Sequence, residues 1–318
     1  MLPTNFVGLL SLCLATTAWA SPAFHFSSLN RNEAHSNSGS THRGSDDLPD
    51  DPSDDCGTDI SVDDAHKEEK RFRTMRRPHR ADEEHFTFQL HYHNVVANTS
   101  FEGGWLDDEV IQTMVDNLNA DFSSTGVNFE LAEINHWSEE NWFFNANKTE
   151  GLDLEVEMKE STRVGGRDTL NVWTIQLPNG PAGYAAFPWN FDKTDQDSIR
   201  DGVILKYSII PGGRSKTRFG RTLTHEVGHW VGLYHTFQGK SCSGEGDFVD
   251  DTPMQLAPTS TKNGCTAIDT CGNDPGDDPI FNFMDYSSDE CRSEFTPGQI
   301  EKIRQELATY RYNEEEQR

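Results

Sequence analysis

The chain has 318 residues, of which 27 are Lys or Arg and 53 are Asp or Glu, so its formal net charge is −26 at pH 7. This acid excess disfavours nucleic acid and anionic membrane surfaces as partners, because phosphate groups are bound by clustered basic side chains. Apart from a short N-terminal run, no stretch approaches the roughly 20 apolar residues of a membrane-spanning helix, which excludes a membrane-spanning protein. The length allows one or two domains, and we expect a monomer.

Residues 1–20 predict a secretory signal peptide. An uncharged apolar run extends from Phe6 to Ala15, and Ala18-Trp19-Ala20 has the small-x-small pattern of a signal-peptidase site. The run is too short to span a membrane, and polar sequence follows it. A buried N-terminal helix is the alternative, but we expect the protein to be secreted and extracellular.

Residues 21–80 are expected to form a largely disordered pro-segment. Only 12 of these 60 residues are apolar, so the segment cannot bury enough surface to offset its ordering entropy. It closes with a basic cluster made of Lys70-Arg71, Arg76-Arg77 and Arg80. In a secreted chain, such a cluster indicates a site of proteolytic trimming, with a solvated linker as the alternative.

After residue 80, 83 of the remaining 238 residues are apolar and their spacing becomes periodic. Alternation predicts a strand at 86–92, and apolar residues at helical spacing after Asp107 predict an amphipathic helix. Further strands are predicted at 127–134, 170–177, 184–189 and 203–210. The closing helix follows Thr296, which starts a capping box with Gln299. This order indicates an α+β or α/β domain over residues 81–318, and we favour α+β.

The most informative segment has the pattern HExxHxxGxxH and begins at His225. His225 and His229 are four residues apart, so on a helix their imidazoles share one face and can bind one metal ion, with Glu226 beside them. Gly232 can adopt a positive φ and end the helix. The chain can then turn, which lets His235 reach the same ion as a third ligand.

Three neutral imidazoles suit Zn²⁺, which in catalytic sites keeps its fourth position for water. The ion lowers the pKa of that water to about 7, and Glu226 is placed to take its proton and pass it to a leaving amine. This is the chemistry of peptide-bond hydrolysis, with one zinc ion per chain. The extended pattern arises by chance in about one such chain in 10,000. A structural zinc site is the alternative, but such sites are usually closed by four ligands and need no adjacent Glu. A third ligand from a downstream Glu is disfavoured by His235.

The extended pattern resembles that of the metzincin metallopeptidases. Downstream, the run from Asn282 to Tyr286 resembles the Met-turn, which places a Met side chain, here Met284, beneath the zinc ligands. Tyr286 matches a family Tyr that can hydrogen-bond the reaction intermediate. Within metzincins the closest resemblance is to the pappalysin group, which includes small secreted fungal members. It rests on residues 223–230, 250–253 and 283–299.

The resemblance implies a catalytic domain with two halves. The upper half would hold a twisted, mostly parallel five-stranded sheet and the active-site helix. The lower half would be irregular, stapled by disulfides, and would carry the Met-turn and the C-terminal helix. An extended peptide or protein substrate would lie between the halves and pair with an edge strand, for which Gly183-Tyr184-Ala185-Ala186 is the candidate.

Four cysteines follow the histidine motif, namely Cys242, Cys265, Cys271 and Cys291. In a secreted protein they predict two disulfides, for which the sequence alone leaves three connectivities. The family pattern favours Cys242–Cys271 together with Cys265–Cys291.

Cys56 lies in the predicted pro-segment, between Asp55 and Gly57. The resemblance implies a latency switch, in which this Cys occupies the open zinc position until the segment is cleaved. A thiolate there would displace the catalytic water. An unpaired or intermolecularly bonded Cys is the alternative.

Residues 241–291 carry 11 Asp or Glu and one Lys. Dense negative charge favours Ca²⁺, which prefers oxygen ligands, and the resemblance implies calcium in this region. Asp247, Asp251 and Thr252 are the candidate ligands, with solvated charge as the alternative. The resemblance also aligns Glu290 with an acidic residue that selects Arg or Lys in a prokaryotic relative, which predicts a preference for these residues.

Two sequons, at Asn98 and Asn147, are candidate glycosylation sites. Together these patterns predict a secreted, zinc-dependent metalloendopeptidase that is made as a latent zymogen. A catalytically inactive secreted protein that keeps the zinc fold for binding is the alternative, but such a protein has no need for the general base Glu226.

Overall fold

The computed structural model describes residues 56–76 and 85–312, all of which belong to one structural unit, Ser45–Arg318. The predicted signal peptide, most of the predicted pro-segment and the basic residues Arg77 and Arg80 lie outside the described residues. Within these two ranges, no helix is both long enough and apolar enough to cross a membrane.

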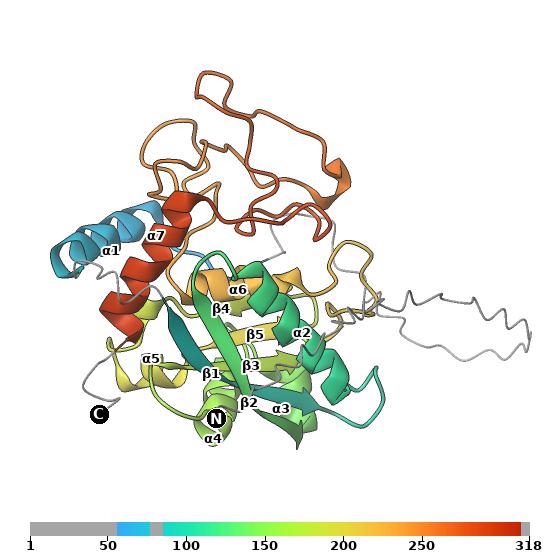
Figure 1. Ribbon diagram of the computed structural model, residues 1–318. Helices are drawn as coiled ribbons and strands as arrows, with labels where there is room; N and C mark the ends of the chain where they lie inside the picture. Colours follow the sequence, from blue (N-terminus) through green and yellow to red (C-terminus); the bar gives the residue numbers. More distant parts are fainter. Residues whose placement is uncertain (1–55, 77–84, 313–318) are drawn as a thin grey trace, which may run out of the picture. The chain divides into compact units, whose positions relative to one another are not determined.

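A five-stranded sheet forms the centre of the domain (Figure 1). Its strands are β1 (Phe86–Val96), β2 (Val127–Ser138), β3 (Thr169–Ile175), β4 (Gly183–Ala185) and β5 (Val203–Lys206). They lie in the order β2-β1-β3-β5-β4, with the first four parallel to one another and β4 antiparallel to β5 at the edge. The α+β class and the mostly parallel five-stranded sheet are confirmed, and the segment expected to pair with substrate forms an edge strand.

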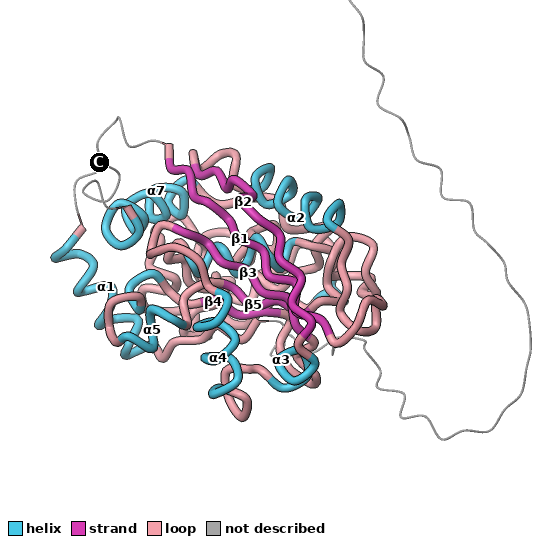
Figure 2. Tube along the Cα trace, turned by 90° about the horizontal axis from the view of Figure 1, so that it is seen from below, coloured by secondary structure: helices cyan, strands magenta, loops and turns pink. Residues whose placement is uncertain are grey.

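Helices cover both faces of the sheet (Figures 1 and 2). One face carries α2 (Asp108–Asp121) and α6 (Arg221–Trp230), and the other carries α3 (Glu140–Asn145) and α4 (Leu152–Thr162). Along β3, Leu170 and Val172 belong to the core shared with α2 and α6. Trp173 and Ile175 alternate with them and pack with side chains of α3 and α4. Because both faces are covered there, β3 and β5 are buried along their whole length, whereas the edge strand β2 keeps exposed positions.

Some predicted boundaries shift because the backbone turns before the apolar pattern ends. The run predicted as one strand over 184–189 is β4 followed by a short 3₁₀ turn, η2 (Pro188–Asn190), since proline has no N–H to continue a ladder. The strand predicted over 203–210 ends at Lys206. Helix α4 was not predicted because two of its buried positions, Glu155 and Lys159, are charged and pair with each other at 3.3 Å. The short helices α3 and α5 (Asp195–Ile199) also lack an apolar stripe.

Between α6 and the closing helix the chain is largely irregular, with one 3₁₀ turn, η3 (Thr261–Asn263). Cys242 bonds to Cys271 and Cys265 bonds to Cys291, which is the pairing that the resemblance implied. Helix α7 (Pro297–Glu306) begins at the predicted capping box and continues into a wider helical turn, η4 (Leu307–Arg311).

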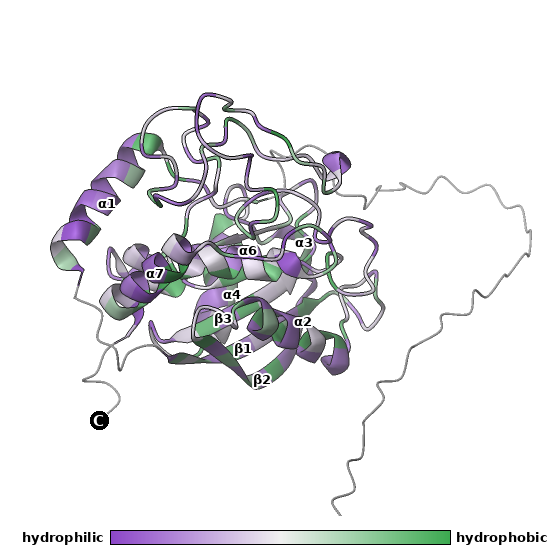
Figure 3. Cartoon of the chain, turned by 45° about the horizontal axis from the view of Figure 1, so that its top comes forward, coloured by the Kyte–Doolittle hydropathy of each residue, from purple (hydrophilic) through white to green (hydrophobic). Residues whose placement is uncertain are grey.

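Helix α1 (Val62–Met75) comes from the predicted pro-segment (Figure 1). Most of it is hydrophilic (Figure 3), but Ala65 and Phe72 pack into an aromatic cluster. The other buried members of this cluster are Phe187, Trp189, Tyr234 and Tyr310. Between Ala65 and Phe72, Glu69 forms a buried ion pair with Lys302 of α7. The domain therefore supplies the apolar partners that the composition of residues 21–80 lacks.

Candidate active site

Helix α6 carries two of the predicted metal ligands, and the turn after it brings in the third. His225 and His229 are buried on α6, and Gly232, with a φ of 104°, turns the chain so that His235 returns to them. The Nε2 atom of His229 lies 3.2 Å from that of His225 and 3.1 Å from that of His235. The turn at Gly232 therefore forms as predicted, and three ring nitrogens converge.

Backbone carbonyls fix the orientation of these rings. Nδ1 of His225 donates to the carbonyl of Phe283, and Nδ1 of His229 donates to that of Leu233, each at 2.7 Å. The lone pair of each Nε2 then points into the site. Burial lowers the pKa of His229 to about 4 and holds the pKa values of the other two imidazoles well below the usual range. Three neutral, buried imidazoles with converging lone pairs fit Zn²⁺.

The Glu226 side chain lies beside this cluster and is fully buried. Its Oε2 accepts a hydrogen bond from Thr58 Oγ1 at 3.0 Å and from Cys56 Sγ at 3.4 Å. Its Oε1 has no hydrogen-bond partner among the residues that the structure describes. Burial raises the pKa of this carboxyl group to about 8, although the bonds from Cys56 and Thr58 oppose the rise. A carboxyl group with a pKa near neutrality can both accept and return a proton.

Met284 lies under α6, and Gly228 is what makes room for it. A Cβ atom at Gly228 would overlap Sδ of Met284 and lie 3.1 Å from its Cε. On the other side of the histidines, the Tyr286 hydroxyl lies 3.2 Å from Nε2 of His235. The guanidinium of Arg218 donates to the carbonyl oxygen of Tyr286 at 2.7 Å, which helps to fix this residue.

Asp289 holds the N-terminal end of α6. Its Oδ2 accepts hydrogen bonds from the backbone N–H of Phe219 at 2.7 Å and of Arg221 at 2.9 Å. Arg292 forms an ion pair with the same carboxylate. The first N–H groups of a helix need such acceptors, and a negative charge there is favourable for the helix dipole.

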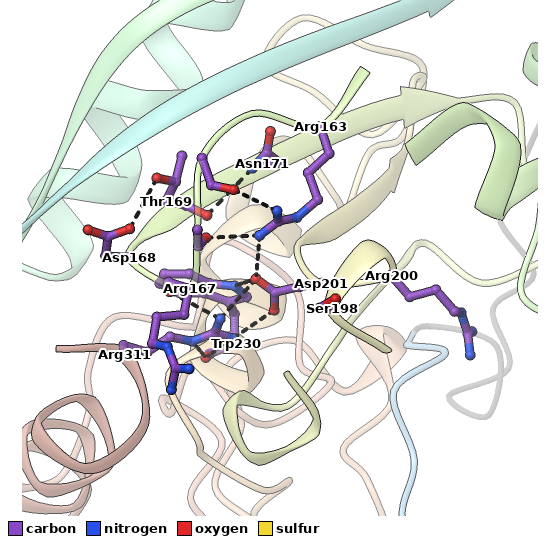
Figure 4. A network of polar contacts seen from close by, with 12 residues as sticks. Arg163, Arg167, Asp168, Thr169, Asn171, Ser198, Arg200, Asp201, Trp230 and Arg311 are labelled. Carbon is purple, nitrogen blue, oxygen red and sulfur yellow. Dashed lines mark hydrogen bonds and ion pairs between the residues drawn. The ribbon is translucent and has the colours of Figure 1, made fainter. Parts of the chain in front are cut away.

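Arg311 holds the C-terminal end of the same helix (Figure 4). Its guanidinium lies 3.9 Å from the ring of Trp230 and donates to the Trp230 carbonyl at 3.1 Å. Two further bonds of 2.9 Å join it to Asp201. Because Trp230 directly follows His229, this network fixes the end of α6 next to the histidine cluster. Neither Arg311 nor Asp289 was found from the sequence, because each is separated from α6 by dozens of residues and belongs to no local motif.

The segment Cys56-Gly57-Thr58 lies across the histidine cluster. The N–H of Gly57 donates to the Gly183 carbonyl at 2.7 Å, and the N–H of Ala185 donates to Thr58 Oγ1 at 2.8 Å, so the segment pairs with β4. Sγ of Cys56 lies 3.5 Å from Nε2 of His229. Burial, and then the charge of Glu226, raise the pKa of this thiol well above its usual value. It would ionise only with a cation beside it.

Known proteins resemble this arrangement in sequence and in structure. The peptidase M43 family model, described as pregnancy-associated plasma protein-A, matches residues 170–308. An extracellular metalloprotease of Podospora anserina is 41% identical over 227 residues, which cover 71% of this chain and 74% of the relative. One of Colletotrichum graminicola is 38% identical over 227 residues, covering 71% and 77%.

The chain belongs to the M43 family of pappalysin-like metallopeptidases. The resemblance seen in the sequence is thereby confirmed. As an M43 peptidase the protein is a secreted metalloendopeptidase, as its extracellular relatives are.

Solved M43-like structures share its fold. A promirolysin mutant of Tannerella forsythia superposes with a TM-score of 0.64 at 24% identity, covering 80% of this chain and 95% of that one. Mature mirolysin in complex with a cleaved peptide gives a TM-score of 0.54 at 27% identity, covering 71% and 92%.

The three predicted calcium ligands of this M43 peptidase do not all line the same cavity. Asp247 and Thr252 line a cavity of about 290 Å³ together with Asp250. Burial raises the pKa of Asp247 to about 7. Asp251 points elsewhere and accepts hydrogen bonds from Thr296 Oγ1 at 2.7 Å and from an N–H at the start of α7. Asp250 was missed because nothing in the sequence separates it from its acidic neighbours.

The remaining predicted sites lie at the surface. Glu290 is exposed beside the Cys265–Cys291 disulfide. Asn98 is exposed, whereas Asn147 is half-buried and its Nδ2 donates to the carbonyl of Asn145 at 3.0 Å.

Proposed function

We propose that this M43 peptidase hydrolyses internal peptide bonds of proteins, with one Zn²⁺ held by His225, His229 and His235 and with Glu226 as general acid and base. The observation that carries the proposal is the convergence of three buried Nε2 atoms, 3.1 and 3.2 Å apart, next to a carboxyl group whose pKa is about 8. When bound, zinc supplies Lewis-acid activation of water and of the substrate carbonyl.

The residues of the chain divide the proton transfers between them. Glu226 accepts a proton as the water oxygen bonds to the carbonyl carbon, and then donates that proton to the amide nitrogen as the C–N bond breaks. Its Oε1, which has no hydrogen-bond partner among the described residues, is available for this. The Tyr286 hydroxyl, 3.2 Å from His235 Nε2, is close enough to donate a hydrogen bond to the substrate oxygen that gains negative charge.

The substrate proposed is an extended peptide that pairs with β4. The main-chain bond from the N–H of Gly57 to the Gly183 carbonyl supports this, because any peptide offers such an N–H, and the N–H of Ala185, which here donates to the Thr58 side chain, is a further donor on the same strand. A preference for Lys or Arg is supported by the acid excess of residues 241–291, which carry 11 acidic side chains and one Lys. In this proposal the exposed carboxylate of Glu290 would attract a basic side chain of the substrate.

We further propose that the protein is made as a zymogen whose Cys56 thiolate takes the fourth zinc position. Ligand atoms of Cys56 and the three histidines lie within 4.8 Å of one another, which suits one ion. Cleavage in the basic cluster that includes Arg76 would then release the segment. Replacing Cys56 by Ala in the full chain should give activity before cleavage, measured on a quenched peptide. If the uncleaved Cys56→Ala variant stays as inactive as the uncleaved wild type, the proposed latency switch is wrong.

Calcium binding near Asp247 is a separate proposal. The cavity lined by Asp247, Asp250 and Thr252 offers oxygen ligands, and a bound cation would remove the cost of ionising a buried carboxyl group. Calcium should raise the melting temperature of the wild type and leave that of Asp247→Asn unchanged. An equal effect on both proteins would place the ion elsewhere.

The central test compares casein hydrolysis by the wild type, Glu226→Ala and the surface control Glu301→Ala, with zinc content measured for each. We expect Glu226→Ala to keep zinc and lose activity, and a chelator to abolish the activity of the other two. Absence of chelator-sensitive hydrolysis in the mature wild type would favour the inactive binding protein instead.

A further inference from the structure

Lys148, in the loop between α3 and α4, contacts the segment that lies across the histidine cluster. Its ammonium Nζ donates a hydrogen bond to the carbonyl oxygen of Gly57, and it lies 5.9 Å from the ring centroid of Tyr184 on β4. The side chain is only half-buried. Lys148 is therefore a cation beside the histidine cluster, and its hydrogen bond goes to the main chain of the segment that lies there.

The bond from Lys148 is one of a set that grips the backbone of this segment. The Tyr286 hydroxyl donates to the carbonyl of Cys56 at 3.4 Å, and the N–H of Gly57 donates to Gly183 at 2.7 Å. The carbonyl oxygen of Cys56 thus accepts a hydrogen bond from Tyr286, and that of Gly57 accepts one from Lys148, in addition to the bond between the Gly57 N–H and β4. None of these contacts depends on the side chains of the segment, so another extended peptide can make them.

We propose that Lys148 is a substrate-binding residue whose ammonium binds a main-chain carbonyl of the peptide close to the scissile bond. This rests on the proposed proteolytic function, in which a substrate takes the place of Cys56-Gly57-Thr58 along β4. A charged donor to a carbonyl is a strong hydrogen bond, and it holds the backbone in register with the catalytic groups.

The side chains packed around Gly57 limit the size of the peptide residue that can occupy its place. A Cβ atom on Gly57 would lie 2.9 Å from Cγ of Pro181, 3.2 Å from Cβ of Tyr184 and 3.3 Å from Cε of Lys148. The lysine end can move aside, but the proline ring and the Tyr184 Cβ are fixed to the backbone. The peptide residue seated against Pro181 should therefore be glycine in preferred substrates, and the Lys148 ammonium should bind the carbonyl of that residue.

The test compares Lys148→Met, which keeps the length of the side chain, with Lys148→Arg and with Lys216→Met as an exposed control. Each is made in the full chain and activated in the same way as the wild type. We expect Lys148→Met to lower kcat/KM by about tenfold on a peptide that spans the subsite, and to have no effect on a peptide that stops short of it. Lys148→Arg should recover part of the loss, and Lys216→Met should match the wild type on both peptides.

Cleavage-site profiling on a peptide library supplies a second readout. The wild type should show enrichment of glycine at one position, and Pro181→Ala should weaken that enrichment without loss of zinc. The same kcat/KM for Lys148→Met and the wild type on the long peptide would overturn the inference, as would an equal loss on both peptides. An inactive wild type with zinc bound would refute the proposed function instead, so the two failures are distinguishable.

The rate at which a thiol reagent labels Cys56 tests whether Lys148 binds only the Cys56 segment or also the substrate. If Lys148 serves only the inhibitory segment, Lys148→Met will label faster in the full chain and its kcat/KM after activation will equal that of the wild type. That combination also overturns the inference. Faster labelling together with lower kcat/KM supports it, because one ammonium would then bind both backbones.

Discussion

Replacing Gly228 by Ala tests whether Met284 fixes the underside of α6. In an ordinary helix interior this change is stabilising, by about 1 kcal/mol, because Ala has the higher helix propensity. Here the added methyl group would overlap Sδ of Met284, which is fully buried, and would lie 3.1 Å from its Cε. Overpacking of a filled core costs about 1–3 kcal/mol, and because Met is flexible but fully buried we take the middle of this range, about 2 kcal/mol. We therefore expect Gly228→Ala to lower the free energy of unfolding by about 1 kcal/mol, against the helix propensity.

A double-mutant cycle isolates the contact. Unfolding by denaturant would be measured for Gly228→Ala, Met284→Ala and the double variant, with Gly166→Ala as a control because a Cβ there comes no closer than 3.4 Å to its nearest neighbour. In the Met284→Ala background the overlap is gone, so Gly228→Ala should become stabilising. The reasoning is refuted if the two changes are additive within about 0.5 kcal/mol, since distant or independent sites behave in that way.

Three further predictions follow from buried polar contacts. Arg311→Met should cost about 3 kcal/mol in denaturant unfolding, the lower end of the range for a broken buried pair, because the Asp201 carboxylate loses two bonds of 2.9 Å and keeps only Arg163 at 3.7 Å and Trp230 Nε1 at 3.4 Å. The double variant with Asp201→Asn should recover part of this, and a loss below about 1 kcal/mol would contradict the prediction. Thr58→Val removes the donor to Glu226 at 3.0 Å, so a thiol reagent should label Cys56 several-fold faster, while Thr58→Ser should behave as the wild type; equal rates for Val and Ser would show that this bond does not hold the segment. Burial raises the pKa of Glu306 to about 8 from a usual value of 4.5, with Lys302 opposing and Glu69 adding to the rise. The folded state keeps this proton where the unfolded chain has lost it, so stability should fall as pH rises from about 4.5 to about 8. Glu306→Gln should flatten the fall in melting temperature between pH 5 and pH 8, and identical slopes would contradict the assignment.

The sequence predicted those features whose residues are close in the chain. HExxHxxGxxH places His225, His229 and His235 within eleven positions, and helix geometry with one glycine turn is enough to bring them together. The capping box at Thr296 and the alternation along β1 are local in the same sense.

Features that depend on distant partners could not be predicted. Helix α1 looks too polar to fold, and it is buried only because an aromatic cluster from the rest of the chain receives Ala65 and Phe72. The bond between Lys148 and Gly57 joins residues 91 positions apart, and no local sequence pattern relates one to the other. The candidate calcium ligands show the same limit, since Asp250 faces the cavity and Asp251 faces α7, although they are neighbours in the sequence.

The supports at the two ends of α6 have a consequence for the order in which the site can form. Asp289 lies 68 residues after the N–H of Arg221 that it accepts from, and Arg311 lies 81 residues after the Trp230 carbonyl that it binds. A chain synthesised only through α6 already contains Glu226 and the first two histidines, but it contains neither support. During synthesis the geometry of the site therefore stays incomplete until the irregular region after α6 and the closing helix have emerged. The segment around Cys56, which is made first, has by then been present throughout.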